Sequence, residues 1–258
     1  MAAAASAGFR GVGLRNDDLS AARAAGVTDA DLRAVLHEHD TEVFEIEFVS
    51  GWSSDDAAIR ANARRVEDEL YALASALGTT PNVNAGCSEP VEAPVALDAM
   101  VERFAAFCDR AAAHGLTLSV EFMPWTGIPD AASAWDLVRQ AGRPNAGVLV
   151  DTWHYFRGAA DPDQLRAIPP ERIAGLQIND AAAQVVGTLR EDTLHRRLLP
   201  GEGAFDLVSL VRTLDTMGVS LPYAIEVISD AQSALPLDVA ARRAFETTTA
   251  VLAGARSG

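Results

Sequence analysis

Basic residues, cysteines and long apolar runs are all scarce in this chain of 258 residues. Lys and Arg number 21 against 36 Asp and Glu, which gives a formal net charge of −15. A surface this acidic repels the phosphates of nucleic acids and of anionic membranes, so we expect partners of neither kind. No apolar run in the sequence approaches the roughly 20 residues that a membrane-spanning helix needs.

The two cysteines, Cys87 and Cys108, indicate neither a disulfide framework nor a metal site. Cys108 lies on the apolar face of a helical pattern, where a buried structural thiol is expected. Cys87 follows a strand-like run, and no second Cys or suitably spaced His accompanies it. The N-terminal stretch MAAAASAGFR also lacks the basic and apolar regions of a secretory signal. We therefore expect a reducing, cytoplasmic location.

A dinucleotide-binding loop is also missing from the sequence. No G-x-G-x-x-G follows a strand and opens a helix, since Gly201–Gly203 is only a G-x-G within a polar loop. No linker or break in composition divides residues 1–258, so we expect a single domain. With 49% hydrophobic residues, a chain of this length can bury the core of a large barrel.

What the chain has instead is a regular alternation of strand and helix patterns. The expected strands are residues 9–15, 42–49, 80–85, 116–124, 146–154, 173–180 and 223–229. The expected helices are residues 29–39, 54–77, 95–114, 131–140, 162–167, 206–217 and 237–252, with a long polar loop at 181–203. This alternation predicts an α/β fold with a parallel sheet, and the best interpretation is one (β/α)8 TIM barrel. A brief stretch near residues 26–28 is the candidate for an eighth strand.

Polar side chains interrupt four of the apolar strands near their C-terminal ends. They are Glu121 in LTLSVEFMP, Asp151 in AGVLVDTWH, Gln177 in IAGLQIND and Glu226 in YAIEVIS. Burying three carboxylates is costly unless a cation compensates them, and a divalent ion held by oxygen ligands is the simplest compensator. Because the C-terminal strand ends form the mouth of a TIM barrel, we expect the four side chains to converge there on a metal ion.

Each of these side chains, taken alone, has an ordinary structural explanation. A glutamate at a strand end is usually solvated or paired, Gln177 could bond a loop, and His154 could bond a nearby carbonyl group. Their occurrence together on four successive strands is what favours a metal site over coincidence.

The segments VEFMP, LVDTWH, LQIND, LLPGEGAFD and AIEV resemble the xylose-isomerase-like TIM barrel superfamily, over most of residues 115–229. This superfamily includes sugar phosphate isomerases and epimerases, inosose dehydratases and the endonuclease IV repair enzymes. In its epimerase branch, Glu, Asp, His and Glu on consecutive strands hold one divalent ion, commonly manganese, magnesium or cobalt. Glu121, Asp151 and Glu226 match these ligands, and Gln177 stands where the histidine is usual.

The resemblance also implies roles for residues around the ion. His154, in the motif D-x-x-H, is expected to contact substrate oxygens. With Gln177 the ligands would all be oxygens, which favours Mn²⁺ or Mg²⁺ over softer metals. Arg197 stands where the repair branch supplies a zinc-binding histidine, and this departure counts against a nuclease. We expect Arg197 to bind substrate oxygens or a phosphate, and a surface charge cluster with His195 and Arg196 is the alternative.

Aromatic and acidic side chains near these positions extend the candidate site. Trp125 and Trp153 lie beside the proposed site residues and could stack on a sugar ring, although packing of loops explains each of them equally well. Glu45 and Glu47 share one face of the strand at 42–49 by period two. They could reach the barrel mouth, but a salt bridge to a neighbouring strand is our expectation.

These features together predict a metal-dependent isomerase or epimerase acting on a sugar or related small polyhydroxy carbonyl compound. A proton next to the carbonyl would be removed to give an enediolate, with the metal as Lewis acid and with Glu121 and Glu226 as base and acid, doubling as ligands as the resemblance implies. The same intermediate could expel a hydroxyl group, so a lyase or dehydratase acting on a keto-sugar or inosose is the alternative. A non-catalytic sugar-binding barrel is a third hypothesis, which the two glutamates oppose. The sequence leaves open the sugar, its phosphorylation and whether the chain forms a homo-oligomer.

Overall fold

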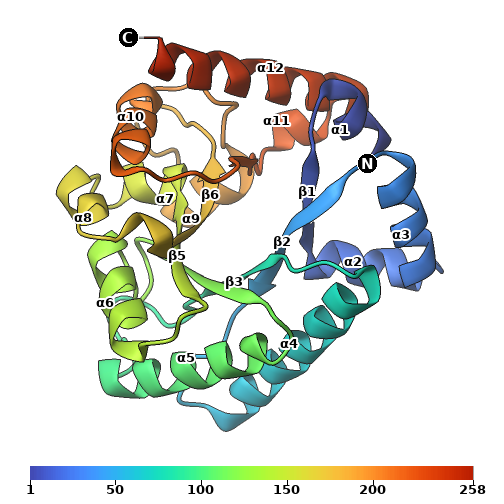
Figure 1. Cartoon of the computed structure of the whole chain (residues 1–258). Helices are drawn as coiled ribbons and strands as arrows, with labels where there is room; N and C mark the ends of the chain where they lie inside the picture. The colour runs from blue at the N-terminus through green and yellow to red at the C-terminus, as the bar shows by residue number, and fades with distance from the viewer. Residues whose placement is uncertain (258) are drawn as a thin grey trace.

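A computed structural model describes residues 1–257 as a ring of parallel strands surrounded by helices (Figure 1). The strands are β1 (Gly11–Arg15), β2 (Glu42–Val49), β3 (Asn82–Gly86), β4 (Thr117–Glu121), β5 (Ala146–Asp151), β6 (Ile173–Ile178) and β7 (Ala224–Ile225). Each strand pairs in parallel with the next one along the chain. The predicted TIM barrel is confirmed, because the described residues form a 7-stranded parallel sheet that curls into a nearly closed barrel.

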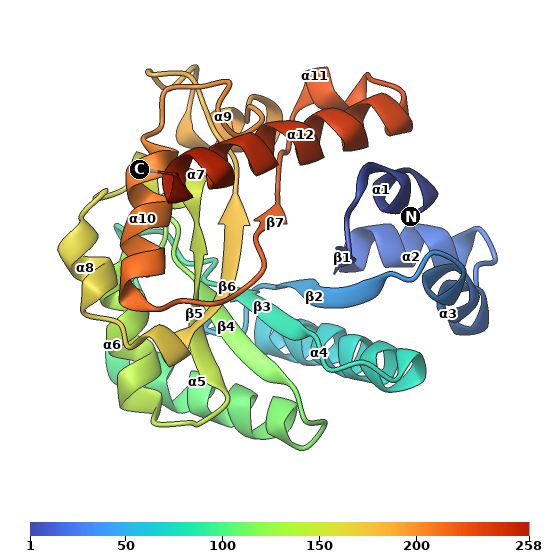
Figure 2. The ribbon, with the colours of Figure 1, turned by 45° about the horizontal axis from the view of Figure 1, so that its top comes forward.

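The expected eighth strand is not found in residues 1–257. Residues 26–28 form a turn and the N-cap of the helix that follows, so the suggestion of a strand there was wrong. As a result β1 and β7 lie at the two ends of the sheet order and make no backbone pairing with each other in the described chain (Figure 2). We call this opening in the barrel wall the seam.

Helices cover the outside of the ring (Figures 1 and 2). Along the first half of the chain they are α1 (Ala2–Ala7), α2 (Asn16–Ala24), α3 (Asp29–Glu38), α4 (Ala57–Leu77) and α5 (Leu97–Ala112). Along the second half they are α6 (Ala131–Ala141), α7 (Thr152–Arg157), α8 (Pro162–Arg166), the 3-10 helix η1 (Pro170–Arg172), α9 (Leu189–His195), α10 (Leu207–Met217), α11 (Asp230–Ser233) and α12 (Leu237–Arg256). The first helix, α1, packs against the last, α12. Within residues 1–257, no helix combines the length and the apolar character that crossing a membrane requires.

Local sequence signals explain the bounds of the long helix α4. The helix was expected to start at Ser54, but its first residue is Ala57, because the side chain of Asp56 accepts a hydrogen bond from the N–H of Ala58 and caps it. It ends at Leu77, and the residue that caps it, Gly78, has a φ of 68°, a left-handed conformation that glycine adopts without strain. One face of the helix packs on the barrel, and its buried apolar residues include Ala63, Leu70, Leu73 and Ala74.

The short helices α7 and α9 were not predicted from the sequence. Helix α7 begins directly after β5, although residues 146–154 were expected to be one strand. The cause is Asp151, whose carboxylate accepts hydrogen bonds from the N–H groups of Trp153 and His154 and so caps a helix at this point. Helix α9 lies within the residues expected to be a loop, and Thr188 and Glu191 form a capping box at its start.

Asp180 organises the loop after β6. Its carboxylate accepts hydrogen bonds from four backbone N–H groups, those of Ala181, Gly201, Gly203 and Phe205. A Cβ atom at Gly203 would overlap Oδ1 of Asp180 and the carbonyl oxygen of Ala181. Glycine is therefore required here because the backbone approaches a buried carboxylate closely.

We expect Gly203→Ala to lower the free energy of unfolding by about 2 kcal/mol, because the carboxylate of Asp180 must move away from its donors. Urea denaturation followed by circular dichroism measures this loss. Gly254→Ala is the matched control, since a Cβ atom there meets nothing within 4 Å. Alanine is the better helix former, so the control should gain about 0.5–1 kcal/mol. A Gly203→Ala variant as stable as the wild type would contradict this account of the loop.

Candidate active site and metal centre

Glu121, Asp151 and His154 come together at the C-terminal ends of two neighbouring strands. Glu121 is the last residue of β4, Asp151 is the last residue of β5, and His154 lies in α7. All three are buried, and one ligand atom of each lies within 4.8 Å of the others. Nε2 of His154 is 3.2 Å from Oε1 of Glu121, and Asn84 donates a hydrogen bond of 3.2 Å to Oε2 of Glu121.

These groups fit a divalent cation. Carboxylate oxygens and an imidazole nitrogen are common ligands of such ions. Three further atoms of the region are buried without a hydrogen-bond partner, namely Nδ1 of His154, Oε1 of Gln177 and Oδ1 of Asn84. Gln177 lies beside Asp151 in the register of β5 and β6. Because an unpaired buried amide oxygen is unfavourable, a cation bound next to it would explain its orientation.

Arg197 is the cation that the structure places among the carboxylates. Its Nη1 donates hydrogen bonds of 2.8 Å to Oδ2 of Asp151 and of 2.8 Å to Oε2 of Glu226. Nε and Nη2 both donate to Thr193, and Nη2 lies 3.5 Å from Nε2 of His154. All three nitrogens of the guanidinium group thus contact groups of the protein.

The sequence offered two interpretations of Arg197. It is 2% exposed, so it does not belong to a surface charge cluster, although the adjacent His195 and Arg196 are exposed. Its predicted contact with substrate oxygens or a phosphate stays a prediction, because its donors face protein groups here. The contacts of Arg197 are those of a side chain that holds two carboxylates in place.

Asp151 accepts four hydrogen bonds. Oδ1 receives them from the N–H groups of Trp153 and His154, and Oδ2 receives them from the side chains of Asn179 and Arg197. Burial works against the charged carboxylate, but the adjacent Arg197 and His154 outweigh it and hold the pKa of Asp151 below its usual value. A divalent cation that uses Asp151 therefore shares it with the guanidinium group or displaces that group.

Three more glutamates meet beside Gln177, whose Nε2 donates a hydrogen bond of 3.2 Å to Oε2 of Glu47. Burial and the repulsion of Glu226 raise the pKa of Glu45 to about 7 and that of Glu47 well above its usual value. Burial, opposed by Arg197, also raises the pKa of Glu226 to about 7. Carboxyl groups that exchange protons near neutral pH are suited to general acid–base catalysis.

The sequence signal for Glu45 and Glu47 was their shared face, but its interpretation was wrong. Neither forms the expected salt bridge within residues 1–257, and both are buried, with exposures of 7% and 6%. Sequence reasoning also missed Asn84 and Asn179, which contact Glu121 and Asp151. Each asparagine interrupts an apolar strand run or follows one, which is the same signal that identified the four carboxylate and amide positions.

The four predicted ligands occupy two parts of the site. Glu121, Asp151 and His154 form one group, which we call the close group, and Glu226 lies outside it. Glu226 follows β7, and Arg197 joins it to Asp151, so the two carboxylates face a common centre. Oε1 of Glu226 lies 3.5 Å from Nη1 of Arg15. Convergence of all four on one ion stays a prediction.

The two tryptophans differ in their surroundings. Trp153 is 0% exposed, and its Nε1 donates a hydrogen bond of 3.2 Å to Asp192, so it packs the loop after β6. Trp125 is half-buried, with its ring centroid 5.2 Å from that of His154. Of the two, Trp125 has the exposed ring area that stacking on a substrate would need, and both substrate contacts stay predictions.

Comparison with known proteins identifies the family. The model of the family described as xylose isomerase-like TIM barrel matches residues 1–250. The chain belongs to this family. The resemblance seen in the sequence is thereby confirmed over nearly the whole chain.

Two curated relatives of this barrel are enzymes with different activities. The chain is 33% identical over 129 residues to the 3-dehydroshikimate dehydratase of Pseudomonas aeruginosa. The aligned segment covers 50% of this chain and 20% of that protein. It is 28% identical over 154 residues to the inosose isomerase of Bacillus licheniformis, and this aligned segment covers 59% of this chain and 54% of that protein. The chain thus spans between a fifth and about half of the length of the relatives it matches.

A solved structure of the IolI protein with a bound zinc atom superposes on the barrel with a TM-score of 0.90. The match covers 100% of this chain and 93% of that chain at 19% identity. At this identity the likeness shows a shared fold.

We expect Arg197→Met to lower the free energy of unfolding by about 3–5 kcal/mol in EDTA, because it leaves the buried carboxylate of Asp151 and the half-buried carboxylate of Glu226 without a cation. Urea denaturation measures this loss. Added Mn²⁺ should stabilise the variant more than the wild type, since the ion then supplies the missing positive charge. The exposed Arg196→Met is the control and should stay within about 0.5 kcal/mol of the wild type. Equal stabilisation of both proteins by Mn²⁺ would count against a cation among these carboxylates.

Proposed function

We propose that this protein is a divalent-metal-dependent isomerase or epimerase acting on a sugar or related polyhydroxy carbonyl compound. The observation that carries the proposal is the cluster of buried and half-buried carboxyl groups inside the barrel and at its mouth, of which Glu45 and Glu226 have pKa values raised to about 7. Such groups can take and return a proton at neutral pH. The similarity to an inosose isomerase supports the substrate class.

The residues that would hold the metal ion are Glu121, Asp151, Gln177 and Glu226, with His154 as a further candidate because it belongs to the close group. When bound, a divalent cation would act as a Lewis acid that stabilises negative charge developing on the substrate oxygens. An oxygen-rich ligand set favours Mn²⁺ or Mg²⁺.

The protein's own carboxyl groups would move the proton. Glu226, held by Arg197 at 2.8 Å, is the proposed base that takes the proton from the carbon next to the carbonyl. Glu121, from β4, is the proposed acid that supplies a proton to the resulting enediolate. Return of a proton to the opposite face of the same carbon gives the epimer, and its return to the neighbouring carbon gives the isomer.

Dehydration is the second candidate, and the 33% identity to a 3-dehydroshikimate dehydratase favours it. Removal of the same proton could then be followed by departure of a neighbouring hydroxyl group. Nε2 of His154, 3.2 Å from Glu121, lies where it could protonate that hydroxyl, which would leave as water. The two candidates share the first step and differ in the bond that breaks next.

The reaction type is tested by incubating protein loaded with Mn²⁺ in deuterated water with ketoses, inososes, 3-keto-sugars and 3-dehydroshikimate. Deuterium in a product of otherwise unchanged formula, seen by NMR, indicates an isomerase or epimerase. Loss of water from the substrate indicates the dehydratase. Absence of deuterium exchange and of product with every compound would contradict both candidates.

We expect Glu226→Gln to lower turnover by at least about 100-fold while the fold stays intact, because the variant loses the proposed base. Turnover of the substrate found by NMR and the circular dichroism spectrum measure the two effects. Glu202→Gln is the control, since Glu202 is an exposed partner of Arg243. Near-normal turnover of the Glu226→Gln variant would remove Glu226 from the mechanism.

Gln177→His is expected to move the metal preference from Mn²⁺ or Mg²⁺ towards Co²⁺ or Zn²⁺. The reason is that an imidazole nitrogen replaces an amide oxygen, and nitrogen ligands suit these two ions better. Titration of each metal into wild-type and variant protein, followed by calorimetry, measures the order of affinities. An unchanged order would show that Gln177 does not select the metal.

A further inference from the structure

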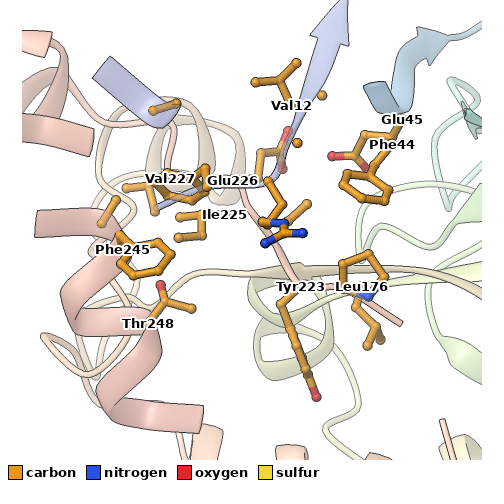
Figure 3. Close-up of a pocket in the computed structure, with 18 of the residues that line it drawn as sticks. Val12, Phe44, Glu45, Leu176, Tyr223, Ile225, Glu226, Val227, Phe245 and Thr248 are labelled. Atoms are coloured by element: carbon orange, nitrogen blue, oxygen red, sulfur yellow. The ribbon is translucent and has the colours of Figure 1, made fainter. Parts of the chain in front are cut away.

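A cavity of about 1080 Å³ follows the seam between β1 and β7 (Figure 3). Its walls come from β1, β2, β6, β7 and α12. Because the backbones of β1 and β7 do not pair, the space extends from the barrel interior to the inner side of α12. Figure 3 shows Phe245 and Thr248 of α12 on one side of it and Phe44 and Glu45 of β2 on the other.

The seam cavity reaches the part of the candidate active site that contains Glu226, whereas Glu121, Asp151 and His154 do not line it. The carboxylates of Glu45, Glu47 and Glu226 belong to its lining, together with Arg15. The other part of its wall is apolar and rich in rings, and it contains Val12, Phe44, Leu176, Tyr223, Ile225 and Phe245. A molecule that reaches the proposed base Glu226 through this cavity therefore contacts charged groups as well as aromatic and aliphatic surface.

Thr248 is an unsatisfied polar group in the wall that α12 supplies. It is 5% exposed, and its Oγ1 is buried without a hydrogen-bond partner. A buried hydroxyl group without a partner is unfavourable, so a bound group that offers a hydrogen bond would be stabilised at this position. Because the wall near Thr248 is aromatic, the ligand group that bonds its hydroxyl would be a single polar atom at the end of an otherwise apolar part of the ligand.

The cavity is larger than a small sugar requires. Its volume of about 1080 Å³ lies just above the range of about 300–1,000 Å³ that is typical of pockets for drug-sized ligands. We propose that the substrate is a polyhydroxy carbonyl compound that carries an aromatic substituent. Its polyhydroxy part lies at Glu226, and its substituent lies in the seam between Phe44, Tyr223 and Phe245. This inference rests on the proposed function for the position of the polyhydroxy part.

The test compares the binding of two analogues that lack the free carbonyl, phenyl β-D-glucopyranoside and methyl β-D-glucopyranoside, to protein loaded with Mn²⁺. Isothermal titration calorimetry should give a Kd at least roughly tenfold lower for the phenyl compound, since its ring is removed from water in the seam. Ala244→Phe fills the cavity from α12 and should abolish this difference. Ala250→Phe, at an exposed position of the same helix outside the lining, should preserve it.

A second variant keeps the test informative if the Ala244→Phe protein does not fold. Thr248→Val preserves volume and removes the hydroxyl group. In the wild type, 4-hydroxyphenyl β-D-glucopyranoside should bind about fivefold more tightly than the phenyl compound. The variant should lose this gain and keep the affinity for the phenyl compound.

Equal affinities for the phenyl and methyl compounds, or no binding of either, would overturn the inference. A preference for the phenyl compound that Ala244→Phe leaves intact in a folded variant would do the same. These results are separate from those on the proposed function. Deuterium uptake by small sugars combined with equal glucoside affinities would leave the proposed function standing, whereas phenyl-dependent binding without turnover of any carbonyl compound would contradict the function alone.

Discussion

The ion pairs of Arg197 with Asp151 and Glu226 are the contacts on which the barrel mouth depends. The carboxylates of Asp151, at the end of β5, and of Glu226, which follows β7, would repel each other, and the guanidinium group lets them lie together. It also bridges the short β7 to the rest of the mouth, since β7 pairs with β6 through only two residue pairs. Ion pairs therefore help to hold β7 in the barrel wall, where the other strands are held mainly by backbone hydrogen bonds.

Asp151 links the formation of the site to the formation of the fold. One of its oxygens caps α7 and so determines where His154 lies, and the other oxygen contacts Arg197 and Asn179. The chain cannot turn from strand to helix here without bringing an imidazole to the carboxylate of Glu121. The helix cap and a candidate metal ligand are thus the same carboxylate, which explains why Glu121, Asp151 and His154 come from consecutive elements.

The parts of this picture that follow from sequence are those with local causes. The alternation of apolar runs predicts the barrel, and buried polar residues at strand ends predict Glu121 and Asp151 as site residues. The helix α7 was missed because an apolar run with a polar end does not distinguish a continuing strand from a capped helix. The partners of Arg197 and the clustering of Glu45 and Glu47 with Gln177 were missed because they join residues far apart in the chain.

The seam gives this barrel something that a closed barrel lacks, namely two strand edges. Unpaired edges are where a further strand from another molecule can add, and proteins protect them by covering them. Here α12 runs over the seam, and α1 packs against α12, so the first and last helices of the described chain form the cover. Protection of the monomer against edge-to-edge association therefore depends on contacts between its two most distant segments, which form only when the whole ring has folded.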